Sequence, residues 1–170
     1  MRVDDVRTIL SSLNEAGIRY LVVGGLAVAA HGYVRFTDDL DLVVQLSPEN
    51  VHNAMAVLRG LGYGPLVPVD ARLFADSVIR EQWRTEKHMK VFQMINSHRP
   101  DTRIDLFVYE PFEFEDTYRR ARQEDLFGVR APIVPLQELL AMKRLAGRPK
   151  DLADIDQLEI LERHDQDQNT

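Results

Sequence analysis

The apolar positions of the chain follow two periods, and each period predicts one type of element. A repeat of three to four residues, typical of one helical face, predicts long helices at 3–16, 48–60, 135–146 and 149–163. Weaker patterns predict short helices at 26–31, 71–77 and 114–122. Short runs rich in β-branched and aromatic residues predict strands at 19–23, 41–44, 63–67, 89–95, 103–108 and 126–130. The turn-rich segment 96–101 indicates that the strands on either side of it form a hairpin.

Interleaved helices and strands indicate an α/β (α+β) fold. We expect a short mixed β-sheet flanked by helices, with the last two helices forming a C-terminal pair. A chain of 170 residues suffices for one core. We therefore expect a single domain over 1–165, followed by a polar tail at 166–170.

Charge and composition exclude several classes of protein. The net charge of -6 arises entirely in the last twenty residues, so the rest of the chain is neutral and a broad surface for duplex nucleic acid is not expected. The absence of cysteine excludes disulfides, thiolate nucleophiles and cysteine-ligated zinc. No uncharged stretch reaches the ~18 residues of a membrane span, and the acidic N-terminal residues do not resemble a secretory signal. We expect a cytoplasmic protein.

A pair of glycines follows the first predicted strand. Gly24 and Gly25 lie between that strand and a short helix. The free N–H groups and the dipole at a helix start favour phosphate, and glycine has no side chain to keep a ligand from the backbone. These two residues are candidates for binding a nucleotide.

Two carboxylates follow at the entrance of the second strand. Asp39 and Asp41 are two residues apart, so both side chains lie on one face while Leu40 and Leu42 face the core. Unpaired carboxylates this close repel each other, and a cation relieves the repulsion. Their spacing suits two divalent ions ~3.5–4 Å apart, the arrangement used in phosphoryl and nucleotidyl transfer.

A third acid is expected on a neighbouring strand, and Asp105 fits. It is the single acid among apolar residues in the strand 103–108. Burying it without a cation or partner would cost several kcal/mol. An isolated Asp-x-Asp pair is more often a solvated turn, but the glycine pair and Asp105 together favour a metal site. An EF-hand loop is excluded because its glycine and its terminal bidentate glutamate are missing, and the spacing of Gly24-Gly25 excludes a dinucleotide-binding fingerprint.

These residues resemble a known superfamily. Gly24-Gly25, Asp39-Leu40-Asp41-Leu42 and the later Asp105 are similar to the pattern of DNA polymerase beta-type nucleotidyltransferases. The segment 143–154, which contains Arg148-Pro149-Lys150-Asp151, resembles the Arg-x-Lys-Asp motif of AbiEii/AbiGii-toxin-like minimal nucleotidyltransferases. The matching motifs lie between residues 21 and 155.

The resemblance implies a role for each matching residue. Asp39 and Asp41 would hold two Mg²⁺ (or Mn²⁺) ions, and Asp105 would complete the site of the catalytic ion and could receive the proton of the attacking hydroxyl. Many members have serine where this chain has Gly25, so only backbone donors remain there. Lys150 would contact phosphate, with Asp151 orienting it. The competing interpretation of these last two is a capped helix, because Asp151 near a helix N-terminus suits the dipole.

Further candidates for contact with the triphosphate are polar residues near these motifs. Arg35 and Thr37 precede the aspartate pair, although a plain surface arginine is an equal interpretation. Lys87 belongs to the densest basic stretch before Asp105, where one cation would neutralise the leaving pyrophosphate. Residues 66–88 are expected to form a lid or to contact the acceptor.

The sequence therefore predicts a metal-dependent nucleotidyltransferase that moves a nucleoside monophosphate from a nucleoside triphosphate to a hydroxyl acceptor. The acceptor would be the end of a tRNA or other RNA, a protein or a small molecule. A toxin–antitoxin role with an antitoxin or regulatory protein partner is part of this hypothesis. Two alternatives stay open: a non-catalytic nucleotide-binding or regulatory module of the same fold, and a metal-dependent phosphohydrolase.

Overall fold

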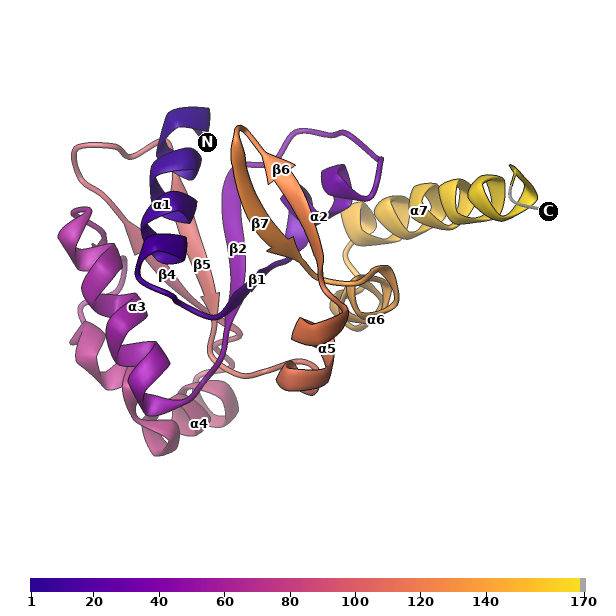
Figure 1. Ribbon diagram of the computed structural model, residues 1–170. Coiled ribbons are helices and arrows are strands. Elements are labelled where there is room, and N and C mark those ends of the chain that lie inside the picture. The colour runs from indigo at the N-terminus through magenta and orange to yellow at the C-terminus, as the bar shows by residue number, and fades with distance from the viewer. Residues whose placement is uncertain (169–170) are drawn as a thin grey trace.

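The computed structural model describes residues 1–168, which fold around one mixed sheet (Figure 1). Its seven strands lie in the order β3-β4-β5-β2-β1-β7-β6. The strands are β1 (Tyr20–Val22), β2 (Asp39–Val44), β3 (Gly64–Pro65), β4 (Val91–Ile95), β5 (Arg103–Phe107), β6 (Arg122–Leu126) and β7 (Val129–Ile133). The helices are α1 (Val3–Glu15), α2 (Gly24–Ala30), α3 (Pro48–Gly60), the 3₁₀ helix η1 (Ala71–Ala75), α4 (Ser77–Glu86), α5 (Phe114–Arg120), α6 (Leu136–Ala146) and α7 (Pro149–Gln168).

The sheet contains both strand orientations. Strand β2 pairs with β1 in the antiparallel direction and with β5 in the parallel direction. Strand β4 pairs with β5, and β6 with β7, as antiparallel hairpins. The predicted mixed sheet, the hairpin across 96–101 and the C-terminal helical pair are confirmed, the pair being α6 packed on α7.

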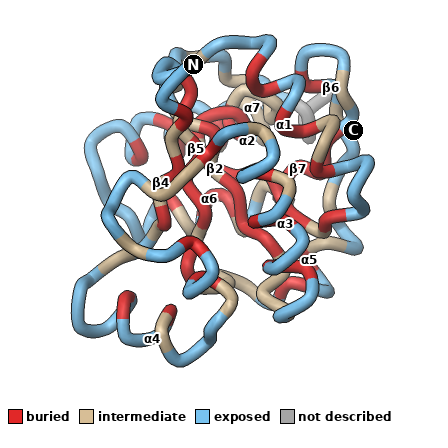
Figure 2. Tube along the Cα trace, turned by 90° about the vertical axis from the view of Figure 1, so that its left-hand side faces the viewer, coloured by how far each residue is buried: buried red, intermediate tan, exposed pale blue. Residues whose placement is uncertain are grey.

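The core follows from the period of two in the central strands. Leu40 and Leu42 of β2 and Ile104 and Leu106 of β5 are fully buried. Buried segments, β2 among them, gather in the interior of the molecule (Figure 2). Helices α1 and α3 pack together at one side of the molecule, whereas α6 packs with α2 and α7 at the other (Figure 1). The far end of α7 projects away from this body.

The predicted strand at 126–130 is wrong, because this segment is the tight turn of a hairpin. Strands β6 and β7 lie on either side of a two-residue turn, Phe127-Gly128, in which both residues have positive φ (59° and 86°). Two-residue hairpin turns require this geometry, and Asn-Gly is its usual sequence. The turn was missed because Phe127 occupies its first position instead of asparagine. Strand β6 was missed because most of its residues are polar.

The segment 66–88 contains a helix that the sequence pattern did not indicate. Helix α4 begins after Asp76, whose side chain accepts hydrogen bonds from the N–H groups of Val78 and Ile79. It buries Trp83, which stacks on Phe92 of β4 with ring centroids 5.3 Å apart. A buried arginine, Arg80, lies on the same helix and donates a hydrogen bond to the Phe74 carbonyl. The buried face of α4 therefore lacks the apolar pattern by which a helix is predicted from the sequence.

Two helix boundaries also differ from expectation. Helix α2 begins at Gly24, so the glycine pair forms its first turn instead of preceding it. Helix α7 continues through Gln168, so the predicted polar tail at 166–170 is helical as far as that residue, and 169–170 lie outside the described residues. No helix in the described part of the chain is long and apolar enough to cross a membrane.

Candidate active site

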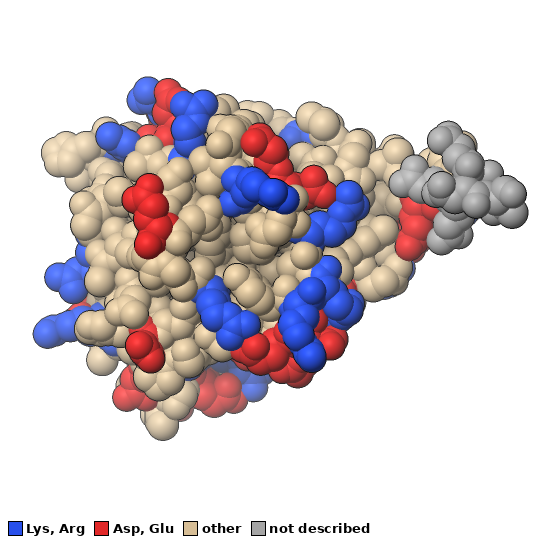
Figure 3. Space-filling model, viewed as in Figure 1, with Lys and Arg blue, Asp and Glu red and all other residues tan. Residues whose placement is uncertain are grey.

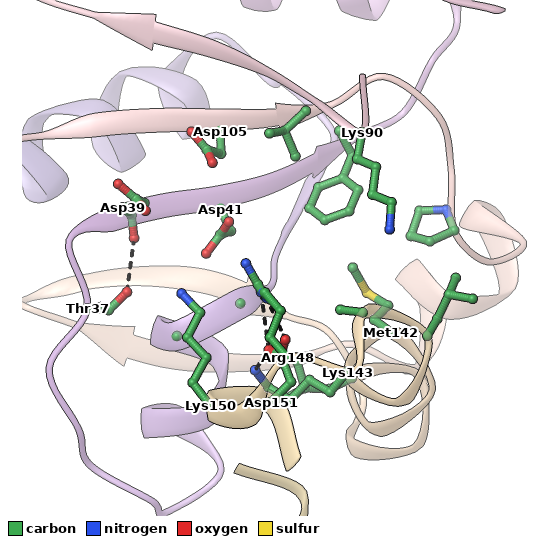
Figure 4. Close-up of a pocket in the computed structure, with 18 of the residues that line it drawn as sticks. Thr37, Asp39, Asp41, Lys90, Asp105, Met142, Lys143, Arg148, Lys150 and Asp151 are labelled. Carbon is green, nitrogen blue, oxygen red and sulfur yellow. Dashed lines mark hydrogen bonds and ion pairs between the residues drawn. The ribbon is translucent and has the colours of Figure 1, made fainter. Parts of the chain in front are cut away.

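The three aspartates lie on one face of two adjacent strands. Strands β2 and β5 pair in parallel with Asp39 opposite Arg103 and Asp41 opposite Asp105. Because side chains alternate along a strand, these residues face away from the buried leucines between them. The expectation that Asp105 lies on a strand next to the aspartate pair is confirmed (Figure 4).

A fourth polar residue extends this row, and the sequence analysis missed it. Gln93 of β4 lies opposite Asp105, and its Nε2 donates to Asp105 Oδ1 at 3.1 Å. The signal was present, because Gln93 is the only polar residue in the strand Val91–Ile95. The row across β2, β5 and β4 therefore reads Asp41, Asp105, Gln93.

Burial and mutual repulsion make the two central carboxylates costly to ionise. Burial raises the pKa of Asp41 to about 6, with further contributions from the charges of Asp105 and Asp39. Burial likewise raises the pKa of Asp105, as does the charge of Asp39, while the hydrogen bond from Gln93 partly opposes the shift. Removing such a penalty is what a bound cation does.

The carboxylates fit divalent cations by their chemistry, although they do not already surround one point. Oxygen ligands are those that Mg²⁺ prefers. Among the described residues no three His, Asp or Glu side chains form a ready-made metal group. Asp39 is engaged in an ion pair, in which its Oδ1 accepts a hydrogen bond from Nε of Arg103 at 2.8 Å. Arg103 thus competes with a cation for Oδ1 of Asp39, whereas no hydrogen bond or ion pair engages Oδ2 among the described residues.

The glycine pair makes room for the second aspartate. Gly24 has φ of +62°, and a Cβ atom placed on it would overlap with Oδ2 of Asp41. The N–H of Gly25 donates to the Asp41 carboxylate. The first turn of α2 and the centre of β2 are thus in direct contact, and no other residue type fits at Gly24 without displacing Asp41.

Gly25 leaves space that a threonine uses. A Cβ atom on Gly25 would overlap with Oγ1 of Thr37, and that hydroxyl makes only a long contact of 3.5 Å with the Asp39 carbonyl (Figure 4). The Thr37 hydroxyl therefore lies where a side chain at Gly25 would begin. The sequence analysis placed both residues near the nucleotide without connecting them.

A cavity of about 380 Å³ lies between this sheet face and the C-terminal helices. It brings together every candidate site residue named from the sequence except one: Gly24, Gly25, Arg35, Thr37, Asp39, Asp41, Asp105, Lys150 and Asp151 line it. Lys87 does not line it, whereas Lys90 of the same basic stretch does. Residues 66–88 contribute nothing to its walls.

The opposite wall of the cavity carries the cations. Arg148, just before α7, and Lys150 in its first turn point toward the aspartates across the cavity (Figure 4). Lys143 of α6 also lines this wall, but its Nζ is turned to Asp151 and Asp154. Asp151 is buried and accepts hydrogen bonds from Arg148 and Lys143, so it orients Arg148 and not Lys150. Arg35 forms a two-point ion pair with Asp154, at 2.6 and 2.8 Å. The sequence analysis named Arg148 only as part of the Arg-x-Lys-Asp motif and assigned no role to it, to Lys143 or to Asp154.

Charges on the outer surface are mixed in sign. On the face shown in Figure 3, Lys and Arg side chains alternate with Asp and Glu side chains. Many charged residues of the described chain form exposed ion pairs, such as Arg19 with Glu115. This face offers no extended basic area for a nucleic-acid duplex.

The fold is that of known nucleotidyltransferases. The chain is similar to ANT(2'')-Ia in complex with adenylyl-2''-tobramycin, with a TM-score of 0.60, 15% identity and coverage of 99% of this chain and 98% of that one. It is similar to the lincosamide antibiotic adenylyltransferase LnuA, lincomycin-bound, with a TM-score of 0.62, 12% identity and coverage of 93% and 96%.

A third similar structure is a nucleotidyltransferase-like protein from Paracoccidioides brasiliensis, with a TM-score of 0.53, 16% identity and coverage of 92% of this chain and 74% of that one. No family model and no curated protein matches the sequence. These likenesses establish the nucleotidyltransferase fold of the chain.

Proposed function

We propose that this protein is a metal-dependent nucleotidyltransferase that moves a nucleoside monophosphate from a nucleoside triphosphate to a hydroxyl acceptor. The observation that carries the proposal is the register of β2 and β5, which sets Asp41 beside Asp105 with Asp39 on the same face. The first turn of α2 touches this group directly. The nucleotidyltransferase fold of the similar structures supports the same reaction class.

Each aspartate has a distinct part in the proposed reaction. Asp39 and Asp41 would hold two Mg²⁺ or Mn²⁺ ions, and Asp105 would share one of them. When bound, these ions supply Lewis-acid activation of the hydroxyl and stabilise charge on the phosphates. Asp105, which is buried on the neighbouring strand, would accept the proton of the attacking hydroxyl.

The chain's cations serve the leaving group. The acceptor oxygen forms a bond to the α-phosphorus while the bond to the bridging oxygen of the β-phosphate breaks, and pyrophosphate leaves. Arg148 and Lys150 face the aspartates across the cavity and would neutralise the departing charge. Thr37 and the backbone of Gly25 would hold the triphosphate between the two walls.

The acceptor belongs to one of three classes: the end of a tRNA or other RNA, a protein side chain, or a small molecule. A small molecule is the acceptor class suggested by the adenylyl-tobramycin and lincomycin complexes of the similar structures. An RNA or protein acceptor remains open beside it. An antitoxin or regulatory partner is suggested by the resemblance of segment 143–154 to AbiEii-type toxins, and a cytoplasmic location remains an expectation from the sequence.

The proposal is tested by following the α-phosphate. Wild type and Asp41→Asn are incubated with each α-labelled nucleoside triphosphate, Mg²⁺ or Mn²⁺, and separately with cell RNA, protein lysate or small hydroxylated compounds. Transfer of label by the wild type alone identifies the class and the acceptor. Release of free nucleoside monophosphate without transfer indicates a phosphohydrolase, and absence of turnover with intact nucleotide binding indicates a non-catalytic module.

A further inference from the structure

Five charged residues form one continuous series of ion pairs along the helical wall of the cavity, and four of them line the cavity. Their order is Arg35, Asp154, Lys143, Asp151, Arg148, with signs that alternate along it. Nζ of Lys143 lies 2.7 Å from Asp154 Oδ2 and 3.4 Å from Asp151 Oδ1. The lysine thus serves both aspartates, and each aspartate holds one arginine through two hydrogen bonds.

Burial separates the five residues into two groups. The side chains of Asp151 and Asp154 are each 1% exposed and that of Lys143 is 5% exposed, whereas those of Arg35 and Arg148 are 22% and 60% exposed. Both arginines line the cavity. The inner three residues therefore have little exposed surface with which to contact a ligand. The guanidinium groups of Arg35 and Arg148, at the two ends of the ion-pair series, are exposed enough to contact one.

The inner aspartates are suited to act as anchors because they stay ionised. Burial alone would raise the pKa of Asp151, but hydrogen bonds and charges from Arg148 and Lys143 outweigh it and lower the pKa. Asp154 has a lowered pKa for the same reason, with Arg35 and Lys143 as its partners. A carboxylate that receives two parallel N–H groups fixes the plane of a guanidinium, which a single contact does not.

We infer that Asp151 and Asp154, sharing Lys143 as their buried counter-ion, are positioning residues that hold the guanidinium groups of Arg148 and Arg35 against the triphosphate. This inference rests on the proposed function, since it names how the same site binds its phosphates. It gives each residue of the Arg-x-Lys-Asp segment its own role: Arg148 and Lys150 contact phosphate, and Asp151 acts only through Arg148.

A double-mutant cycle on phosphate binding tests the inference. The probe is inorganic tripolyphosphate in the presence of Mg²⁺, and calorimetry measures its dissociation constant. Because this probe carries no nucleobase, the result does not depend on which nucleotide the protein prefers. We expect Arg148→Met to weaken binding about tenfold, the effect of losing one charge-assisted contact. Asp151→Asn should weaken it by a similar factor in the wild type, but by less than about twofold when Arg148→Met is already present.

The matched control is Lys150→Met, which removes a neighbouring cation of the same wall. Lys150 makes no ion pair among the described residues, so Asp151→Asn should keep its full effect in that background. If Asp151→Asn costs the same factor with and without Arg148, then Asp151 contacts the phosphate itself or acts on the whole fold, and the inference is overturned.

A second variant keeps the test decisive if Asp151→Asn does not fold. Arg148→Lys changes a largely exposed side chain, so it keeps the fold and the charge but loses the two-point pair with Asp151. We expect it to bind tripolyphosphate nearly as weakly as Arg148→Met, and binding equal to the wild type would overturn the inference. If the wild type binds neither tripolyphosphate nor any nucleoside triphosphate, the proposed function fails together with it.

Discussion

The two walls of the cavity differ in whether their buried carboxylates have cationic partners. On the sheet wall, formed by Asp39, Asp41 and Asp105, the two buried carboxylates have neutral partners, the Gly25 N–H and the Gln93 amide. On the helix wall, formed by α6 and the start of α7, Asp151 pairs with two cations. The pKa of Asp41 is raised to about 6, whereas that of Asp151 is lowered.

The difference indicates which wall needs a ligand. A buried charge pair with complete hydrogen bonding needs no ligand to compensate for its burial, because the attraction between the two charges offsets their loss of hydration. Asp41 and Asp105 repel each other and form no ion pair among the described residues, so the more distant charges of Lys143, Arg103 and Lys150 offset their repulsion and burial only in part. The sheet wall therefore stores unfavourable energy that cation binding would release, and the helix wall supplies fixed geometry.

The largest expected effect is on catalysis by the sheet wall. Replacing Asp41 or Asp105 by asparagine keeps the shape and removes one negative charge, so we expect nucleotidyl transfer to fall by at least about 10³-fold. Thermal unfolding near pH 7.5 should occur at the same or a higher temperature, because a repulsive pair is lost. The control is Asp38→Asn, an exposed acid of the same cavity, which should stay within a few-fold of the wild type. Substantial activity in Asp41→Asn would contradict the assignment.

On the helix wall the largest effect should be on stability. Lys143→Met leaves Asp151 and Asp154 buried without their shared cation, and we expect the free energy of unfolding to fall by about 3–5 kcal/mol. Urea denaturation measures the loss. Lys150→Met, on the exposed side of the same wall, should change stability by less than about 0.5 kcal/mol. Equal effects of the two substitutions would show that the ion network does not hold this wall together.

The pH dependence of stability should come from the sheet wall. Because the pKa of Asp41 is higher in the folded chain than in the unfolded one, its contribution is complete below pH ~4 and is lost as pH rises through about 6. The loss is on the order of 2–3 kcal/mol in protein freed of divalent ions. Urea titrations from pH 4 to 7.5 should show this decline in the wild type and a much flatter curve in Asp41→Asn.

Added Mg²⁺ offers a further check on the same carboxylates. Ions that bind only the folded chain stabilise it by mass action. Mg²⁺ should therefore raise the unfolding temperature of the wild type above pH 6 and leave that of Asp41→Asn nearly unchanged. An identical response of both proteins would place the ion elsewhere.

The sequence predicted the sheet wall better than the helix wall. A period of two is enough to set Asp39 and Asp41 on one face, and a lone acid in an apolar strand is visible from the sequence as a residue that needs a partner. The register of β2 against β5, which sets Asp41 opposite Asp105, involves residues 64 positions apart, and no local pattern encodes it.

The ion network was hidden for the same physical reason. Arg35 and Asp154 lie 119 residues apart in sequence, so their pairing depends on the tertiary fold alone. Asp151 was expected to orient Lys150, and Lys143 looked like an ordinary polar position of an amphipathic helix, so the pairing of these two residues was missed. The turn at Phe127-Gly128 and the helix α4 were missed because a bulky residue adopts positive φ in one and an arginine is buried in the other.

The smallest predicted effect concerns the contact between Thr37 and Gly25, where the two walls meet the first turn of α2. Thr37→Ala removes the hydroxyl, and we expect binding of nucleoside triphosphate to weaken about two- to tenfold, the range of one neutral hydrogen bond. Gly25→Ser alone should also weaken binding, because its Cβ would overlap with the Thr37 side chain. In the combined variant the overlap with the Thr37 hydroxyl is gone and the serine returns a hydroxyl, but the Cβ of residue 37 would still lie 2.6 Å from the new Cβ, so affinity should recover only in part. Calorimetric titration of the four proteins measures this, and losses that simply multiply would mean that the Thr37 hydroxyl does not occupy the position of a side chain at Gly25.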